Sequence, residues 1–206
     1  MEFQLTPEEG EFLVKLARKA VEEYLEGGVT IKTPKDVSAK LMECCGVFVT
    51  LNKVRGEEKE LRGCIGFPYP TLPLYEAVQR SAISSAFEDP RFPSLEKEEL
   101  NKIIFEISIM TEPELIRVKD SKEYPNKIET GKDGLILQCG SSSGLLLPQV
   151  CLQFNWCAEE FLENLCYKAG LTPDYIHDKN TKIWKFQCQI FAEEKPKGKI
   201  VELTKH

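Results

Sequence analysis

The sequence predicts an α+β protein built mostly from antiparallel sheets with flanking helices. Segments with apolar residues at helical spacing alternate with segments in which apolar and polar residues alternate, and four of the latter pair up as two hairpins. The regular strand–helix–strand rhythm of a parallel sheet is missing. A chain of 206 residues suits one large domain, or two subdomains that share a core.

The first element is a helix over residues 6–26. Thr6 is the predicted N-cap, Pro7 occupies the first helical position, and Glu9 is the acid of a capping box. Apolar residues then recur at helical spacing, and a glycine pair at 27–28 ends the helix.

A hairpin follows from Gly46, in the stretch GVFVTLNKVRGEEKELRGCIG. It reads as a strand, a polar turn around Arg55 and Gly56, and a returning strand. The second arm, KELRGCIGFPYP, is unusual because Gly63 and Gly66 weaken a strand, and such glycines mark a bulge or a close approach to the backbone.

Strict alternation would place Arg62 and Cys64 on the same face of this arm. A guanidinium beside a thiol favours the thiolate, which is the better nucleophile and the better metal ligand. The alternative is structural: Cys64 is a small buried apolar residue, and Arg62 pairs with Glu60 or another surface acid.

The remaining elements follow the same two patterns. A helix at 74–87 follows three prolines, and the turn EDPRFPSL leads from it to a strand at 102–110. A hairpin over 134–150 turns at 141–144 and is closed by Pro148. A helix at 158–169 ends at Gly170, and a last strand at 182–191 has Trp184, Phe186, Cys188 and Ile190 on one face.

Composition narrows the class of protein. The net charge of −6 argues against a broad basic surface for a duplex or a membrane, although a local basic groove stays open. The N-terminus has no secretory pattern and no apolar run could span a bilayer, so we expect a cytoplasmic location and eight cysteines held as thiols. Disulfides would be expected only in a hyperthermophilic source. No Gly-rich phosphate loop occurs, and cysteine spacing gives no zinc pattern, so we predict no cofactor and no metal.

Six segments then identify a family. The stretches GVFVTL, ELRGCIG, DPRFPSL, ISIMTEPE, GLLLPQV and EEFLENLCYKAGL resemble, in order and spacing, the AMMECR family over nearly the whole chain. The six residues 61–66, LRGCIG, match its signature. The resemblance implies a single domain over residues 1–206 made of two unequal subdomains, the larger from both ends of the chain, with a cleft between them near the signature.

The resemblance implies less about function. The family has no established reaction, and a basic role in transcription, replication, repair or translation, or in RNA or protein modification, has been suggested for it. Some relatives are linked to Memo-type and radical-SAM proteins by fusion or gene neighbourhood, which implies possible pathway partners. The oligomeric state stays open.

The family motifs give a candidate site. It comprises Cys64 and Arg62 as catalytic candidates, with Gly63, Gly66, Asp89, Arg91 and Gln149 as binding candidates. Turns and strand ends on a rigid scaffold commonly carry binding residues. A structural reading of DPRFP stands beside this one: a rigid connector in which Asp89 caps the turn and Arg91 pairs with an acid.

Two functions from different classes remain. The first is an enzyme whose cleft uses Cys64, assisted by Arg62, on a small molecule or a nucleotide-like substrate. The second is a ligand-binding or adaptor protein without bond chemistry, which we favour because no base for the thiol is identified. If RNA binds, we expect it to contact Arg62 and Arg91 in the cleft.

Three other features have structural interpretations. Cys151 and Cys157 depart from the family pattern and are read as packing residues, with a disulfide conceivable. His177 is read as an exposed loop residue. The lysines at 195, 197 and 199 are flanked by glutamates and are read as a solvated terminus.

Overall fold

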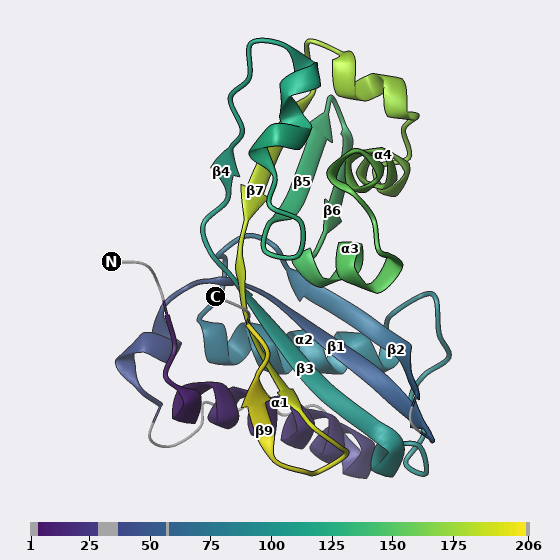
Figure 1. The fold of residues 1–206 in the computed structure, drawn as a ribbon. Coiled ribbons are helices and arrows are strands. Elements are labelled where there is room, and N and C mark those ends of the chain that lie inside the picture. Colours follow the sequence, from purple (N-terminus) through teal and green to yellow (C-terminus); the bar gives the residue numbers. More distant parts are fainter. Residues whose placement is uncertain (1–3, 29–36, 57, 205–206) are drawn as a thin grey trace. The chain divides into compact units, whose positions relative to one another are not determined.

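The computed structural model describes residues 4–28, 37–56 and 58–204. These residues form two compact units, the first from residues 1–110 with 189–206 and the second from residues 111–188. Each unit has its own sheet and its own apolar core. The predicted α+β class is confirmed, because both sheets contain antiparallel pairs and both are accompanied by helices (Figure 1).

The sheet of the first unit has the strand order β2-β1-β3-β8-β9. Its strands are β1 (Gly46–Arg55), β2 (Glu58–Phe67), β3 (Ile103–Met110), β8 (Cys188–Glu193) and β9 (Ile200–Glu202). β1 pairs antiparallel with both β2 and β3, so the predicted hairpin is confirmed and its second arm is an edge strand.

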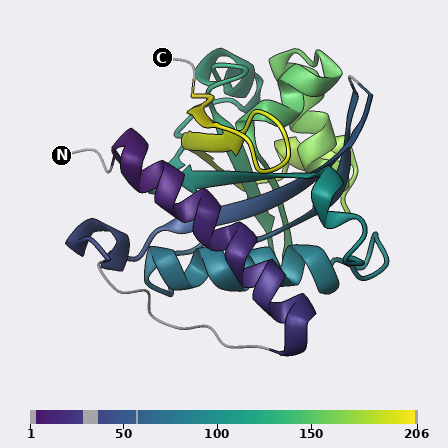
Figure 2. The ribbon, with the colours of Figure 1, turned by 90° about the horizontal axis from the view of Figure 1, so that it is seen from below.

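Two helices of the first unit pack against this sheet, α1 (Pro7–Gly27) against β3 and β9 and α2 (Leu74–Phe87) against β1 and β2 (Figure 2). Both match the predicted helices, and Thr6 and Glu9 form the predicted capping box. The core between helices and sheet takes the odd-numbered side chains of β1 and β3, such as Val49 and Ile107. The short 3-10 helices η1 (Ala39–Met42) and η2 (Leu100–Lys102) complete this unit.

The second unit has a sheet with the order β4-β7-β5-β6. Its elements are β4 (Glu114–Leu115), η3 (Ser121–Lys127), β5 (Gly134–Cys139), β6 (Ser142–Leu146), α3 (Pro148–Phe154), α4 (Ala158–Lys168), η4 (Pro173–His177) and β7 (Lys182–Phe186). The apolar stripe predicted at 158–169 faces the core of this unit through Phe161 and Leu165.

Four expectations are corrected. The second hairpin turns at Gly140 and Ser141, because Gly140 takes the positive φ of +60° that a two-residue loop requires. Pro148 also starts the short helix α3. Proline is tolerated there because the first N–H groups of a helix have no acceptor within it.

The predicted strand at 182–191 is two strands. It divides at Gln187 into β7 of the second unit's sheet and β8 of the first unit's sheet. Alternation of apolar residues continues through such a break, so the pattern alone does not reveal it.

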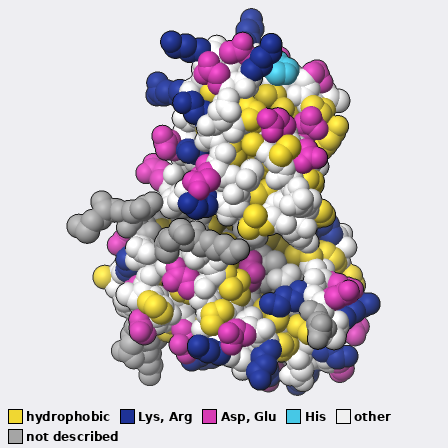
Figure 3. Space-filling view, viewed as in Figure 1, with side chains coloured by type: hydrophobic (Ala, Val, Ile, Leu, Met, Phe, Trp, Pro, Cys, Tyr) yellow, Lys and Arg dark blue, Asp and Glu magenta, His cyan; other side chains and the backbone are white. Residues whose placement is uncertain are grey.

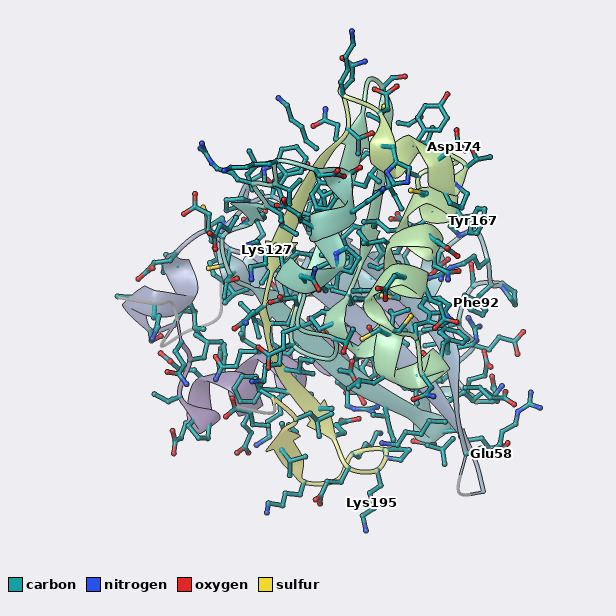
Figure 4. All side chains as sticks on the ribbon, turned by 45° about the horizontal axis from the view of Figure 1, so that its top comes forward. Glu58, Phe92, Lys127, Tyr167, Asp174 and Lys195 are labelled. Carbon is teal, nitrogen blue, oxygen red and sulfur yellow. The ribbon has the colours of Figure 1, made fainter. Side chains whose placement is uncertain are left out.

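The lysines at 195, 197 and 199 are exposed, as predicted, but they do not form a terminus. They lie in the turn between β8 and β9, where Lys195 is labelled in Figure 4. Lys197 is 3.3 Å from a carboxylate oxygen of Glu22 on α1.

Candidate functional site

The family motifs of the first unit lie against each other. LRGCIG is in the edge strand β2, and DPRFP is the segment directly after α2. Cys64, Arg62, Gly63, Gly66, Asp89 and Arg91 therefore belong to one compact unit. Gln149 lies in α3 of the second unit, so its place in the same site stays a prediction.

Gly63 is required by the close approach of α2 to β2. A Cβ atom at Gly63 would lie 2.0 Å from the carbonyl oxygen of Ser85. The Ser85 hydroxyl accepts a hydrogen bond from the Ile65 N–H at 2.8 Å and donates one to the Val49 carbonyl at 2.7 Å, so it bridges β2 and β1. The glycine predicted to mark a close backbone approach does so here.

Gly66 is constrained by β1 in a similar way. A Cβ atom there would lie 2.2 Å from the Val47 carbonyl oxygen and 2.6 Å from the Phe48 ring. The two signature glycines thus hold the strand in tight contact with its neighbours, and neither contact assigns them to a ligand.

Asp89 and Arg91 bind the outer edge of β2 at Cys64. The Cys64 N–H donates to Asp89 Oδ2 at 2.9 Å, and Arg91 Nη2 donates to the Cys64 carbonyl at 3.2 Å. Arg91 also grips the carboxylate, through Nε to Oδ1 at 2.9 Å and Nη2 to Oδ2 at 2.7 Å. The pair thereby satisfies backbone groups that an edge strand would otherwise expose.

The contacts of Asp89 with Arg91 and Cys64 keep its carboxylate ionised. Burial alone would raise the pKa of Asp89, but hydrogen bonds from the Arg91 side chain and the Cys64 backbone outweigh it and lower the pKa to about 2. These contacts agree with the structural interpretation of DPRFP, because Asp89 also accepts the Arg91 backbone N–H at 3.1 Å, as a turn cap does, and Arg91 pairs with this acid. The binding role of the segment stays a prediction.

The alternation that would place Arg62 and Cys64 on one face of β2 is interrupted. The register shifts by one residue, with Leu51 opposite Gly63 and Asn52 opposite Leu61, so Arg62 is the extra residue of a β-bulge and alternation is interrupted. Arg62 instead donates to Glu99, with Nη2 2.9 Å from Oε2.

Glu99 receives a second cation. Lys53 Nζ lies 2.5 Å from Glu99 Oε1, and the Arg62 hydrogen bond is the main reason why the pKa of Glu99 falls to about 2. Nη1 of Arg62 is buried and has no hydrogen-bond partner among the described residues.

Phe92, labelled in Figure 4, connects the two arginines. Its ring centroid is 5.9 Å from the guanidinium carbon of Arg62 and 5.4 Å from that of Arg91. Both distances are within the range of cation–π contacts.

The Cys64 thiol has different neighbours from those expected. Thr50 Oγ1 donates to Cys64 Sγ at 3.3 Å. On the other side of Thr50, Glu106 of the neighbouring strand β3 is directly opposite it in the sheet. Burial raises the pKa of the Cys64 thiol, while the Thr50 hydrogen bond and the Arg91 charge lower it and the charges of Glu106 and Asp89 raise it further. The Arg62 guanidinium donates to Glu99, so these contacts give no support to the expectation that Arg62 favours a Cys64 thiolate.

Sequence reasoning missed Ser85, Glu99, Thr50 and Glu106. Thr50 could have been found by extending the hairpin register from Arg55 and Gly56, but the bulge at Arg62 shifts that count by one residue. Glu106 lies on β3, whose register this hairpin does not set. Ser85 and Glu99 contact the signature only through tertiary packing, which no local pattern encodes.

The other candidate chemistries have little in their favour. All eight cysteines are free, with Cys151 buried and Cys157 exposed, so the conceivable disulfide between them is absent. His177 is exposed as expected, and its Nδ1 lies 2.7 Å from the Ser121 hydroxyl. No cluster of three or more potential metal ligands occurs in the described part of the chain.

Surface charge is mixed on the face shown in Figure 3, where lysines and arginines alternate with aspartates and glutamates. The coloured side chains of that face form no broad basic patch of the kind that a duplex attracts. Among the described helices, none is both long and apolar enough to cross a membrane.

These observations define a class of α+β proteins in which an LRGCIG edge strand is bound by a DPRFP segment. The chain belongs to the AMMECR1 family, whose model matches residues 14–191. It is 51% identical over 201 residues to protein PH0010 of Pyrococcus horikoshii, covering 97% of each chain. A protein of Thermofilum pendens is 48% identical over 205 residues, covering 97% of this chain and 96% of its own.

The fold agrees with a solved relative. The crystal structure of the uncharacterised protein PH0010 matches with a TM-score of 0.92 at 51% identity, covering 96% of this chain and 98% of that one. The family prediction is therefore confirmed.

Proposed function

We propose that the protein binds a small ligand bearing a carboxylate or phosphate group beside Cys64, with Arg91 and Arg62 as the groups that hold the anion. The observation that carries this proposal is the pair of guanidinium groups against one Phe92 ring. Each guanidinium is fixed by an acid, and Nη1 of Arg62 is buried without a hydrogen-bond partner among the described residues.

Arg91 is suited to recognise an anion because it is both fixed and accessible. Its side chain is 45% exposed, whereas its partner Asp89 is only 2% exposed. A guanidinium held through one edge presents its remaining N–H groups in a set orientation, and such preorganisation lowers the entropy lost on binding.

Arg62 has a buried donor that a ligand oxygen could satisfy. Its side chain is buried, and a buried N–H without a partner is unfavourable by about 1–3 kcal/mol. Arg62 and Lys53 together carry one more positive charge than Glu99 neutralises. A ligand oxygen would satisfy both the N–H and the excess charge.

Other parts of the proposal rest on the family resemblance. They are the role of Gln149, the cleft between subdomains as the location, the single AMMECR-type domain over the whole chain, and Memo-type or radical-SAM proteins as pathway partners. A nucleotide falls within the proposed ligand class, which is why RNA or protein modification and translation remain the processes we propose.

The test is a calorimetric titration of the wild type with pyrophosphate, adenosine monophosphate and citrate. Arg91→Lys keeps the charge beside Asp89 but loses the planar fork, so we expect it to weaken binding about tenfold. Arg80→Lys is the matched control, because Arg80 is 48% exposed and lies 2.7 Å from Glu76, much as Arg91 lies 2.7 Å from Asp89. Equal affinities in the two variants, or no binding of any probe to the wild type, would contradict the proposal.

A further inference from the structure

Three polar side chains lie in one row across the first sheet. Thr50 of β1 is directly opposite Cys64 of β2 and directly opposite Glu106 of β3. Their neighbours Val49 and Leu51 face the helical core, so the row is on the sheet's other face. Directly opposite residues in antiparallel strands have Cβ atoms about 4.5–5.5 Å apart, which places a hydroxyl between a thiol and a carboxylate.

The hydroxyl already contacts the thiol. Thr50 Oγ1 and Cys64 Sγ are 3.3 Å apart, and Thr50 is 8% exposed. In this structure Thr50 donates to the sulfur. A hydroxyl both donates and accepts hydrogen bonds, so rotation about its C–O bond lets Thr50 accept the S–H proton on one side and release its own proton on the other. Glu106 is directly opposite Thr50 on the second side, and its charge acts on the Cys64 thiol, so it is the carboxylate placed to take that proton.

We propose that Glu106 accepts the proton of the Cys64 thiol through the Thr50 hydroxyl, which makes Cys64 a nucleophile toward an electrophilic carbon. The place where the electrophile binds, beside Arg91, rests on the function proposed above, whereas the proton relay does not. Thr50 and Glu106 are positioning residues here, and Cys64 is the group that touches the reacting atom.

In this step a lone pair of Cys64 Sγ forms the bond to carbon, and the leaving group departs with the electron pair of the bond that breaks. The S–H proton passes to Thr50 Oγ1 while the Thr50 proton passes to the Glu106 carboxylate. No oxidant, reductant or further reactant is needed.

The relay supplies the base that the thiol otherwise lacks. Burial raises the pKa of Cys64, and the charged groups that face it are Arg91 and Asp89 from the segment after α2 and Glu106 from β3. A carboxylate is too weak a base to ionise such a thiol beforehand, so proton transfer must accompany bond formation. A neutral thiol that reacts only in a concerted step is protected from unselective oxidation.

The test is the alkylation of Cys64 by iodoacetamide from pH 6 to 9, followed by mass spectrometry of the peptide that contains Cys64. Iodide is the leaving group of this probe. Cys44 and Cys157 are exposed and serve as internal reference thiols, and buried Cys166 reports loss of fold by becoming reactive.

The two explanations of Glu106 predict opposite signs. If Glu106 acts only through its charge, Glu106→Gln lowers the pKa of Cys64 and alkylation becomes faster. If it accepts the proton, Glu106→Gln slows alkylation at pH 7 by about tenfold or more. Thr50→Val should slow it to the same extent, Thr50→Ser should restore it, and Glu60→Gln on β2 is the control for a charge change outside the row.

The relay is overturned if Glu106→Gln alkylates as fast as the wild type or faster, or if Thr50→Val has no effect. It is also overturned if the wild-type rate follows only the ionised fraction of the thiol, without a plateau near neutral pH. Because iodoacetamide carries no anionic group, its reaction with Cys64 does not require the proposed anion site. Calorimetry therefore tests the binding proposal and alkylation tests the relay, so failure of the one is distinguishable from failure of the other.

Discussion

The first unit contains two ion-paired arginine clusters that differ in how completely their hydrogen bonds are satisfied. Arg18 of α1 donates through Nε to Glu193 Oε1 at 2.6 Å and through Nη2 to Glu193 Oε2 at 2.5 Å. Nη2 also reaches the Ile103 carbonyl at 2.6 Å, and the guanidinium carbon lies 4.5 Å from the Phe105 ring centroid. The guanidinium of this buried pair therefore has hydrogen-bond acceptors at Nε and Nη2 and an aromatic ring packed against it.

The cluster at β2 is built from the same residue types but is incomplete. Arg62 has a buried Nη1 without a partner among the described residues, and Arg91 is half-exposed. The Arg18–Glu193 pair connects α1, β3 and β8, and its hydrogen bonds leave no donor for a ligand. The β2 cluster has an unpartnered donor on Arg62 and an accessible guanidinium on Arg91. This difference separates the structural Arg18 from the proposed binding residues Arg62 and Arg91.

The largest expected effect is at the structural cluster. Arg18→Ala leaves the Glu193 carboxylate buried without its partner, and we expect unfolding free energy to fall by about 3–5 kcal/mol. Urea or guanidinium unfolding measures this. Lys19→Ala is the control, because Lys19 is 68% exposed and pairs only with Glu23, so its loss should be at most about 1 kcal/mol. Equal losses in the two variants would contradict the structural role of the Arg18–Glu193 pair.

Acid should act on the β2 cluster. Asp89 and Glu99 have pKa values lowered to about 2 from ordinary values of 3.8 and 4.5, so each stabilises the fold fully above its ordinary pKa. That stability is lost as the pH falls from about 4.5 to about 2, and each group contributes about 2–3 kcal/mol at most. Unfolding at a series of pH values should show Asp89→Asn and Glu99→Gln each flattening this acid slope. An unchanged slope in both variants is the contrary result.

Gly63 tests how firmly the candidate site is attached to the helical layer. Gly63→Ala places a methyl group against the Ser85 carbonyl, where 2.0 Å separates the ideal positions, so α2 and β2 must move apart. We expect a loss of about 1–3 kcal/mol in thermal or denaturant unfolding. A variant as stable as the wild type would mean that the approach of α2 does not constrain the signature strand.

The smallest expected effect on stability is at the proposed binding arginine. Arg91→Lys keeps a cation beside Asp89 and changes a half-exposed side chain, so unfolding free energy should fall by at most about 1 kcal/mol. The same variant should lose ligand affinity. A stability loss as large as that of Arg18→Ala would place Arg91 with the structural arginines.

Much of the fold could be predicted because its signals are local. Thr6 and Glu9 are three residues apart, and the helix at 74–87 needs only its own spacing. The break at Gln187 could not be predicted, because it depends on which sheet each half of the strand joins.

The candidate site was predictable only in part. The family segments place Cys64, Asp89 and Arg91 together, and the hydrogen bonds among them agree with that grouping. The partner of Arg62 could not be inferred from spacing, since a single-residue bulge redirects it from Cys64 to Glu99. The row through Thr50 needs the register of three strands, which the sequence does not state.

One measurement compares the clusters directly: the Nε–Hε resonances of the arginines during a titration with pyrophosphate. We expect Arg91 and Arg62 to shift together to a common saturation point, while buried Arg18 and the exposed control Arg80 stay in place. Shifts of Arg18 or Arg80 as large as those of Arg91, or no shift of Arg91 and Arg62 at saturating pyrophosphate, would contradict the assignment of anion binding to the β2 cluster.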